Sequence, residues 1–238
     1  MSLRVALFAS HYYGLSLLQN TLSLKERYPE IEIVGVASDD PHQSYVSPQK
    51  RLWQYPHTEK EEEMVAAIAK KNGIPVWRER VKTRKFHNVF SSWMPDVCYM
   101  SVFGQRIPET IWSRPLYGFY NFHSCGGEVW PSNTGAQAFE SMSRDSAARG
   151  AVAMHAVDNE LDHGPLVAFS RFFNFSADEG VLQTFKRTSP LVGELMTWHL
   201  EEILGANTKD VTSPRVINEE QMEPVWGPAI RRNNRNVA

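Results

Sequence analysis

Short apolar runs alternate with amphipathic segments in the N-terminal half of the chain, and this alternation limits the possible folds more than any other feature. Val5–Ala9 and Glu32–Ala37 are typical of buried strands, and the leucines spaced along residues 15–24 indicate a helix between them. A strand, a helix and a strand at this spacing predict a βαβ unit. We therefore expect an α/β fold, with a mostly parallel twisted sheet and helices on both faces.

The same pattern continues towards the C-terminus. Further helices are expected over residues 59–71, 86–93, 135–143 and 181–204, the last interrupted at Ser189–Pro190, and further strands over residues 74–77, 96–102, 118–123, 150–157 and 165–173. Residues 1–204 are thus predicted to form one domain. After Gly205 the composition shifts to Asn, Pro, Arg and Glu. We expect residues 205–238 to be a tail that wraps the domain or contacts a partner chain, which makes a homodimer possible.

Composition excludes several classes of protein. The formal net charge of the 238 residues is -2, which gives no electrostatic reason to expect nucleic-acid binding. The longest apolar runs are shorter than a membrane span, so no membrane partner is expected. The only cysteines are Cys98 and Cys125, which implies no disulfide framework and fits a cytoplasmic location. A small molecule is therefore the expected partner.

Three polar residues stand where chemistry is expected. Asn121 and His123 lie in an apolar strand-like run, and Asp162 follows the strand predicted over residues 150–157. Ligands of open parallel sheets bind beyond the carboxyl ends of the strands, where such side chains can converge. An amide can hold a carbonyl oxygen, an imidazole can transfer a proton, and a carboxylate can orient the imidazole. This combination is suited to acyl transfer to an amine.

Three segments in this order resemble one known family. They are Phe103–Pro108 after the strand at Asp96, then Gly118–His123, then Gly150–His155 followed by Leu161–Pro165. The chain resembles the formyltransferases that use 10-formyltetrahydrofolate, a family that includes methionyl-tRNA, glycinamide ribonucleotide and sugar-nucleotide formyltransferases. The resemblance covers roughly residues 1–175. It implies a Rossmann-like formyltransferase fold with a short C-terminal extension.

The resemblance also implies a role for each site residue. Asn121 would bind the formyl oxygen, His123 would transfer protons and stabilise the oxyanion, and Asp162 would orient His123 and a water molecule. The donor would be 10-formyltetrahydrofolate. Its pterin ring would be held by two segments, which contain Phe103, Gly104, Gln105, Arg106, Ile107, Val157, Asp158 and Leu161. No metal is implied.

Departures from the family pattern concern the rim of the site and the acceptor. The segment Ser124–Pro131 is longer than its family counterpart, and Ala153 replaces a family Thr. Ala9–Gly14 is too bulky for the glycine-rich phosphate loop of glycinamide ribonucleotide enzymes, and only a short tail is available where methionyl-tRNA enzymes carry a further domain. An amino sugar on a nucleotide is the first choice of acceptor. An N-hydroxyornithine-type side chain, hydrolysis of the folate, and an inactive folate-binding protein are the alternatives.

Ordinary structural roles compete with these functional ones. A single histidine is more often a satisfied core residue than a catalyst, and only the combination of three residues favours catalysis by His123. His155 is expected to be structural and Asp158 to cap a turn. Cys125 is not expected to be a nucleophile. The segment His11–Tyr13 either contacts the acceptor or forms an exposed aromatic turn, and Trp130 either stacks on a ligand or belongs to the core.

Overall fold

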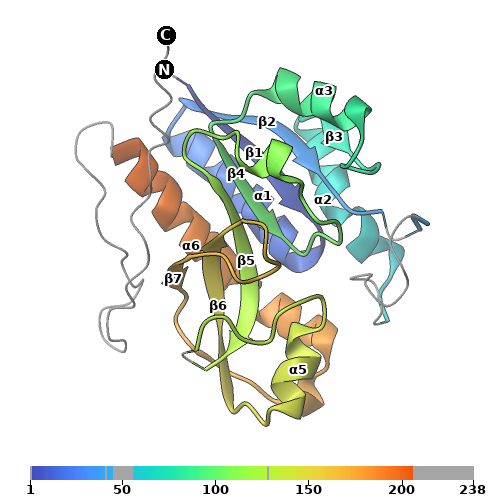
Figure 1. Cartoon of the computed structure of the whole chain (residues 1–238), viewed down its shortest axis with the longest axis vertical. Helices are drawn as coiled ribbons and strands as arrows, with labels where there is room; N and C mark the ends of the chain where they lie inside the picture. Colours follow the sequence, from blue (N-terminus) through green and yellow to red (C-terminus); the bar gives the residue numbers. More distant parts are fainter. Residues whose placement is uncertain (1, 41, 45–55, 128, 206–238) are drawn as a thin grey trace.

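The computed structural model describes residues 2–40, 42–44, 56–127 and 129–205, which form one sheet with helices packed against it (Figure 1). The described strands follow the order β3-β2-β1-β4-β5-β6-β7, and β8 pairs with β6. Their bounds are β1 Leu3–Ala9, β2 Ile31–Ala37, β3 Val76–Trp77, β4 Val97–Ser101, β5 Phe119–Gly126, β6 Arg149–Ala156, β7 Leu166–Phe169 and β8 Phe173–Asn174.

The sheet has a parallel part and an antiparallel part. From β3 to β5 all neighbours are parallel, and from β5 onward the pairs β5–β6, β6–β7 and β6–β8 are antiparallel. The chain winds from β1 towards β2 and β3, and then from β4 towards β5 on the other side. The change of direction therefore falls between β1 and β4, the place where open α/β sheets bind ligands. The predicted α/β class with a mostly parallel sheet is confirmed.

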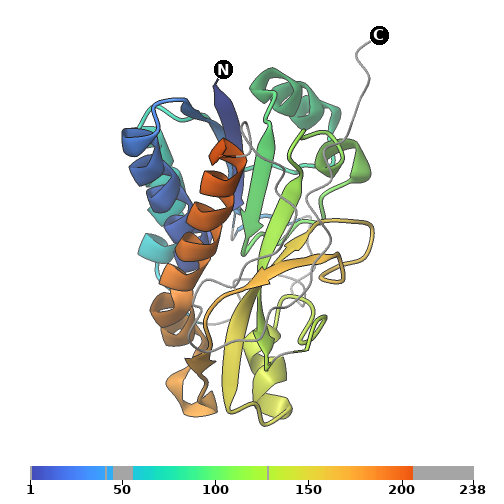
Figure 2. The ribbon, with the colours of Figure 1, turned by 90° about the vertical axis from the view of Figure 1, so that its left-hand side faces the viewer.

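Helices cover both faces of the sheet, as the alternation of apolar residues predicts. Figure 2 shows α1 and α6 side by side on one face, and α3 lies on the opposite face. The bounds are α1 His11–Arg27, α2 Glu59–Lys71, α3 Arg84–Trp93, α4 Glu109–Trp112, α5 Ala138–Arg144, the 3-10 turn η2 Ala177–Glu179, and α6 Val181–Gly205. Successive residues of β1 point to opposite faces, so that Leu7 packs beneath α1 and α6 while Phe8 packs beneath α3.

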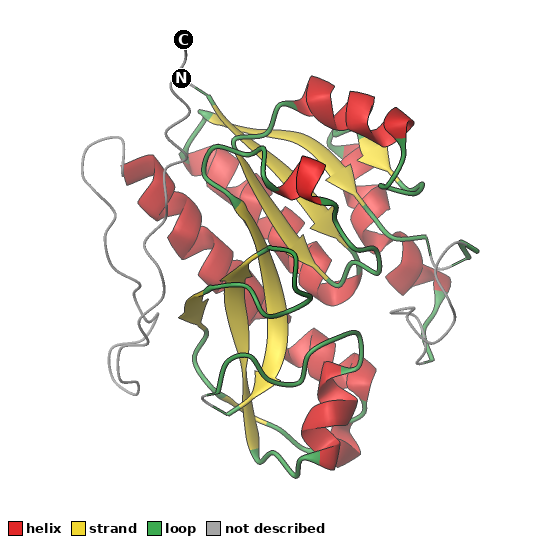
Figure 3. Cartoon of the chain, viewed as in Figure 1, coloured by secondary structure: helices red, strands yellow, loops and turns green. Residues whose placement is uncertain are grey.

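Two predictions about the C-terminal elements are wrong. Helix α6 is continuous through Pro190, although an interruption was expected there. Pro190 cannot donate to the carbonyl of Lys186, but the hydroxyl of Ser189 donates to that carbonyl at 3.0 Å and satisfies it. The strand expected over residues 165–173 is divided into β7 and β8, and the colours by secondary structure in Figure 3 show the loop between them. Ser170 ends the first part, because its hydroxyl accepts the Val152 N–H at 2.9 Å.

The described residues cover most of the predicted domain but almost none of the predicted tail. Residues 2–204 fall into one sheet with its covering helices, apart from position 41, residues 45–55 and position 128. The predicted tail lies outside the described residues except for Gly205, so its role stays a prediction. Within the described ranges, every helix is too short or too polar to span a lipid bilayer.

Candidate active site

The site forms where β5 extends past the end of β4. Asn121 pairs with Met100 near the carboxyl end of β4, and on its other side it pairs with His155 of β6. His123 follows two residues later, on the same face of β5 as Asn121. Strand β5 continues to Gly126, so these residues lie within the strand and not at its end as predicted. They nevertheless lie at the level where the parallel neighbour stops, which agrees with the expected position of the site.

Asp162 approaches this strand from the loop between β6 and β7. Its φ angle is 53°, in the left-handed region that residues other than glycine seldom occupy. The loop also contains a turn in which the Glu160 N–H donates to the Asp158 carboxylate at 2.8 Å, so the predicted turn-capping role of Asp158 is confirmed. The carboxylate of Asp162 is 6% exposed and is directed at β5.

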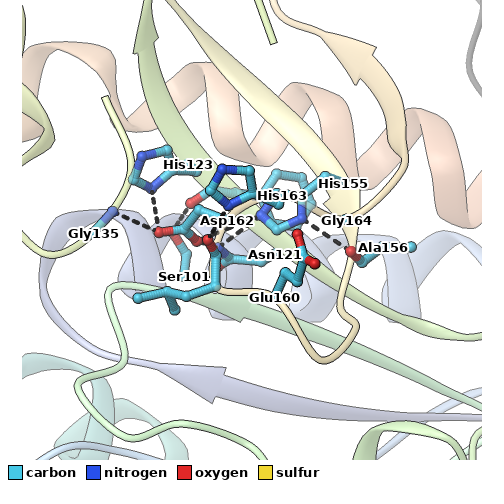
Figure 4. A network of polar contacts seen from close by, with 12 residues as sticks. Ser101, Asn121, His123, Gly135, His155, Ala156, Glu160, Asp162, His163 and Gly164 are labelled. Atoms are coloured by element: carbon cyan, nitrogen blue, oxygen red, sulfur yellow. Dashed lines mark hydrogen bonds and ion pairs between the residues drawn. The ribbon is translucent and has the colours of Figure 1, made fainter. Parts of the chain in front are cut away.

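The three predicted catalytic residues meet at this carboxylate (Figure 4). The amide nitrogen of Asn121 donates to Oδ1 of Asp162 at 3.0 Å. Oδ2 of Asp162 lies 3.7 Å from Nδ1 of His123 and accepts the backbone N–H of Gly135 at 2.8 Å. Nε2 of His155 lies 3.7 Å from Oδ1. The carboxylate is therefore surrounded by two imidazole rings and two N–H donors.

The hydrogen bonds of the two imidazoles define where their protons lie. Nε2 of His123 is 2.8 Å from the carbonyl of Asn133, so this nitrogen donates, and a second ring proton would face Asp162. Nδ1 of His155 donates to the Ala156 carbonyl at 3.0 Å. Nε2 of His155 therefore accepts, from the Asn121 amide at 3.1 Å. Both N–H groups of Asn121 are thus engaged, one with His155 and one with Asp162.

The charges of the site favour an ionised Asp162. Burial by itself would raise the pKa of this carboxyl, but the charge of His123, the interaction with His155 and the Gly135 N–H outweigh burial and hold the pKa far below its ordinary value. Asp162 is therefore negatively charged across the whole physiological pH range. A buried carboxylate of this kind can orient an adjacent imidazole and stabilise its protonated form.

The two segments predicted to hold the pterin ring are joined to each other. The guanidinium of Arg106 donates to the carbonyl of Asn159, which connects the segment 103–107 to the loop that carries Asp162. Leu161 is 59% exposed on the same loop. The structure thus connects the two predicted segments beside Asp162, while their role in folate binding stays a prediction.

Several side chains of these segments face the protein interior. Ile107 is buried, and Phe103 packs edge-on against Phe8 with ring centroids 5.5 Å apart. The Gln105 side chain accepts the Val81 N–H at 2.9 Å. The N–H groups of Gly104 and Val157 are bonded to the Asp39 carboxylate and the Phe119 carbonyl, at 3.2 and 2.8 Å. These residues hold the two segments in position, which leaves other backbone groups to contact a ligand.

Four residues that were not predicted to belong to the site contact the predicted residues or their neighbours. His155 was expected to be structural, and it does bond across the strand pair, but it also lies beside Asp162. Asn133 and Gly135 bind His123 and Asp162 from the segment that follows the altered loop. Trp130 of that loop stacks on the ring of His155, with centroids 4.7 Å apart. The segment Ser124–Gly126, predicted as part of the loop, belongs to β5.

Other sequence alternatives are resolved by burial. Cys125 is buried, and burial raises the pKa of its thiol to about 12, so it is not a nucleophile at neutral pH, as predicted. The exposed aromatic turn considered for His11–Tyr13 is wrong. These residues begin α1, where His11 and Tyr13 are buried and the hydroxyl of Tyr12 donates to Glu61 at 2.8 Å.

Known proteins are similar to this chain in sequence and in fold. No family model matches the sequence. A methionyl-tRNA formyltransferase of Myxococcus xanthus is 26% identical over 151 residues, which cover 63% of this chain and 47% of the relative. The chain thus spans about half the length of this curated relative.

Solved structures with low sequence identity share the fold. A phosphoribosylglycinamide formyltransferase of Anaplasma phagocytophilum superposes with a TM-score of 0.63 at 16% identity, over 85% of this chain and 87% of the other. A formyltetrahydrofolate deformylase of Pseudomonas syringae superposes with a TM-score of 0.59 at 17% identity, over 86% of this chain and 62% of the other. The chain is thus similar in sequence to methionyl-tRNA formyltransferases, and it shares its fold with phosphoribosylglycinamide formyltransferases and a formyltetrahydrofolate deformylase.

Proposed function

We propose that this protein transfers a formyl group from 10-formyltetrahydrofolate to the primary amine of a small molecule. The observation that carries the proposal is the convergence of Asn121, His123 and Asp162 at the end of β4, with an ionised carboxylate at the centre. The similarity to methionyl-tRNA formyltransferases in sequence, and to a formyltetrahydrofolate deformylase in fold, supports this donor. The buried free thiols of Cys98 and Cys125 fit the cytoplasmic location that we propose for the reaction.

The proposed reaction forms a bond between the amine nitrogen and the formyl carbon, and breaks the bond between that carbon and nitrogen 10 of the folate. An alkyl amine has a pKa of about 10, so it must lose a proton before or during attack. His123 would accept or relay that proton, with Asp162 stabilising the charged ring, and would return a proton to the departing nitrogen. The sum of these transfers leaves the enzyme unchanged.

The tetrahedral intermediate of this reaction carries an oxyanion that requires fixed donors. Protonated His123 would be one such donor, once its Nε2–H turns from the Asn133 carbonyl to the oxyanion, and Asn121 would be the other. Since both N–H groups of Asn121 are engaged in this structure, one of them would turn from His155 or Asp162 to the formyl oxygen when the donor binds. Loss of one donor of this kind commonly reduces turnover about a hundredfold.

The acceptor that we propose is an amino sugar on a nucleotide, with an N-hydroxyornithine-type amine as the alternative. The reason remains the bulky sequence at the start of α1, where His11 and Tyr13 are buried and a glycine-rich phosphate loop would need small residues. The relatives are named for two other acceptors, methionyl-tRNA and phosphoribosylglycinamide. All four acceptors therefore belong in the same test.

Incubation of the full chain with 10-formyltetrahydrofolate and each acceptor tests the proposal. Formylated product and free formate are measured separately by mass spectrometry, and His123→Ala serves as the inactive control. Formylation of one small-molecule amine that His123→Ala abolishes is the expected result. Formate release without any acceptor would identify a hydrolase instead, and formylation of methionyl-tRNA alone would refute the small-molecule acceptor.

Binding of the donor is tested independently of turnover. The stable analogue 5-formyltetrahydrofolate should raise the melting temperature, because a ligand that binds only the folded state stabilises it in proportion to the logarithm of its concentration. His123→Ala should retain this increase. An unchanged melting temperature at saturating analogue would contradict the proposed donor.

A further inference from the structure

Trp130 contacts both imidazoles of the site from the loop that departs from the family pattern. Its ring lies 4.7 Å from that of His155 at an interplanar angle of 37°, and 6.2 Å from that of His123 at 65°. The indole N–H donates to the carbonyl of Gly164 at 3.0 Å. Trp130 thus joins the loop after β5 to the loop between β6 and β7.

His155 is held on the side of Gly164 as well. A methyl group added to Gly164 would lie 1.8 Å from the Ala156 carbonyl oxygen and 3.3 Å from Nδ1 of His155. This close approach of backbone to ring requires glycine at position 164. His155 is only 2% exposed and donates to Ala156, so the indole, the Gly164 backbone and this hydrogen bond together restrict its rotation.

The orientation of His155 determines the orientation of the Asn121 amide. With Nδ1 of His155 donating to Ala156, Nε2 can only accept, and it accepts from Asn121. A rotated His155 would present a donor to the amide nitrogen, which would be repulsive. The amide would then turn its oxygen towards His155 and lose its direction relative to Asp162.

We propose that Trp130 is a positioning residue, which holds His155 in the orientation that directs the amide of Asn121 towards the reacting formyl group. This inference rests on the proposed formyl transfer. Trp130 acts through His155 and does not itself touch the reacting atoms. Because displacement of a catalytic group by about 1 Å can reduce turnover about a hundredfold, loss of this contact should affect kcat more than the KM of the donor.

Two substitutions distinguish the effect of the Trp130 ring on His155 from the effect of the indole hydrogen bond to Gly164. Trp130→Leu removes the aromatic contact and the indole N–H, and should reduce kcat about tenfold to a hundredfold while the donor KM changes less than about threefold. Trp130→Phe keeps an aromatic ring beside His155 and should restore kcat to within about threefold of wild type. Trp112→Leu is the matched control, because Trp112 is another partly buried indole but ends α4 and packs against a different core cluster, which contains Phe86 and Phe90 of α3.

A second readout does not depend on activity. In nitrogen-15 NMR spectra of the full chain without ligand, His155 should be the Nδ1-protonated tautomer in wild type and Trp130→Phe, and a mixture of tautomers in Trp130→Leu. If wild type shows no turnover but the His155 tautomer still differs between wild type and Trp130→Leu, the proposed function is refuted and the positioning role of Trp130 remains. A Trp130→Leu protein that keeps both the tautomer and kcat would overturn the role of Trp130. An equal loss of kcat in Trp112→Leu would also overturn it, since general destabilisation would then explain the effect.

Discussion

Two buried carboxylates on either side of the sheet's change of direction have opposite electrostatic environments. Asp39 follows β2 and is 1% exposed, and Asp162 is 6% exposed. Burial raises the pKa of Asp39 to about 6, because the Gly104 N–H and the Gln105 side chain only partly compensate for lost hydration. The pKa of Asp162 is held far below its ordinary value by the histidines and N–H groups around it.

The comparison teaches that burial alone does not identify the carboxylate suited to catalysis. Asp39 contacts the segment 103–107 and has one oxygen, Oδ1, without a hydrogen-bond partner among the described residues. Asp162 contacts titratable rings that can exchange protons with a substrate. We therefore propose that the chemistry depends on Asp162, and we expect Asp39 to hold the segment 103–107 in place.

A large difference in kcat is expected between the two amides that accompany these carboxylates. Asn121→Ala removes the amide that binds both Asp162 and His155, and should reduce kcat about a hundredfold while analogue binding is retained. Gln105→Ala should instead increase the donor KM, because its side chain holds the segment 103–107 against Val81. Steady-state kinetics with varied donor measures both. Equal effects on kcat would remove the distinction between the surroundings of Asp39 and those of Asp162.

The pH dependence of stability should differ in sign for the two carboxylates. Asp39 binds a proton more tightly in the folded state, so its contribution to stability falls as pH rises from about 4 towards 6, by on the order of 3 kcal/mol. Asp162 contributes stability that is present above pH 4 and is lost only as pH falls through its low folded-state pKa.

Urea unfolding of wild type and Asp39→Asn between about pH 4 and pH 7 checks the sign for Asp39. The free energy of unfolding of wild type should decline relative to Asp39→Asn as pH rises. Parallel curves would show that Asp39 is ordinarily solvated, and the contrast with Asp162 would then disappear. Loss of stability below pH 4 should remain in both proteins.

The smallest expected effect concerns the backbone contact of Asp39. A methyl group on Gly104 would lie 2.6 Å from Oδ2 of Asp39, so Gly104→Ala must displace the segment or the carboxylate. The donor KM should rise a few-fold, up to about tenfold, with kcat nearly unchanged. Gly205→Ala is the control, because no atom of the described residues lies within 4 Å of its added methyl group. A donor KM equal to that of the control would mean that this contact does not position the segment.

The local pattern of the sequence predicted most of the fold. Helix α2 has the predicted bounds, and strands β1 to β4 lie within one or two residues of theirs, because apolar periodicity is a local property. Continuity of α6 through Pro190 was not predictable, because it depends on a hydroxyl that replaces the missing donor. The division of β7 from β8 likewise depends on a pairing with Val152, which is distant in sequence.

The candidate site was predictable in its residue types but not in its connections. Asn121, His123 and Asp162 were identified through motifs, and the structure brings them together. The bonds from His155 and Gly135 to this group depend on strand register and loop conformation, which a single sequence does not specify. The sequence did not indicate that Trp130 contacts His155, because it shows only that Trp130 lies in a segment that departs from the family pattern.

Turnover of 10-formyltetrahydrofolate by Asp162→Asn and Asp39→Asn tests the central claim most directly. Each substitution removes one buried negative charge with almost no change in shape. We predict that Asp162→Asn reduces kcat on the order of a thousandfold, within the range for loss of proton transfer, whereas Asp39→Asn stays within about tenfold of wild type. A fully active Asp162→Asn protein would contradict the assignment of the chemistry to this carboxylate.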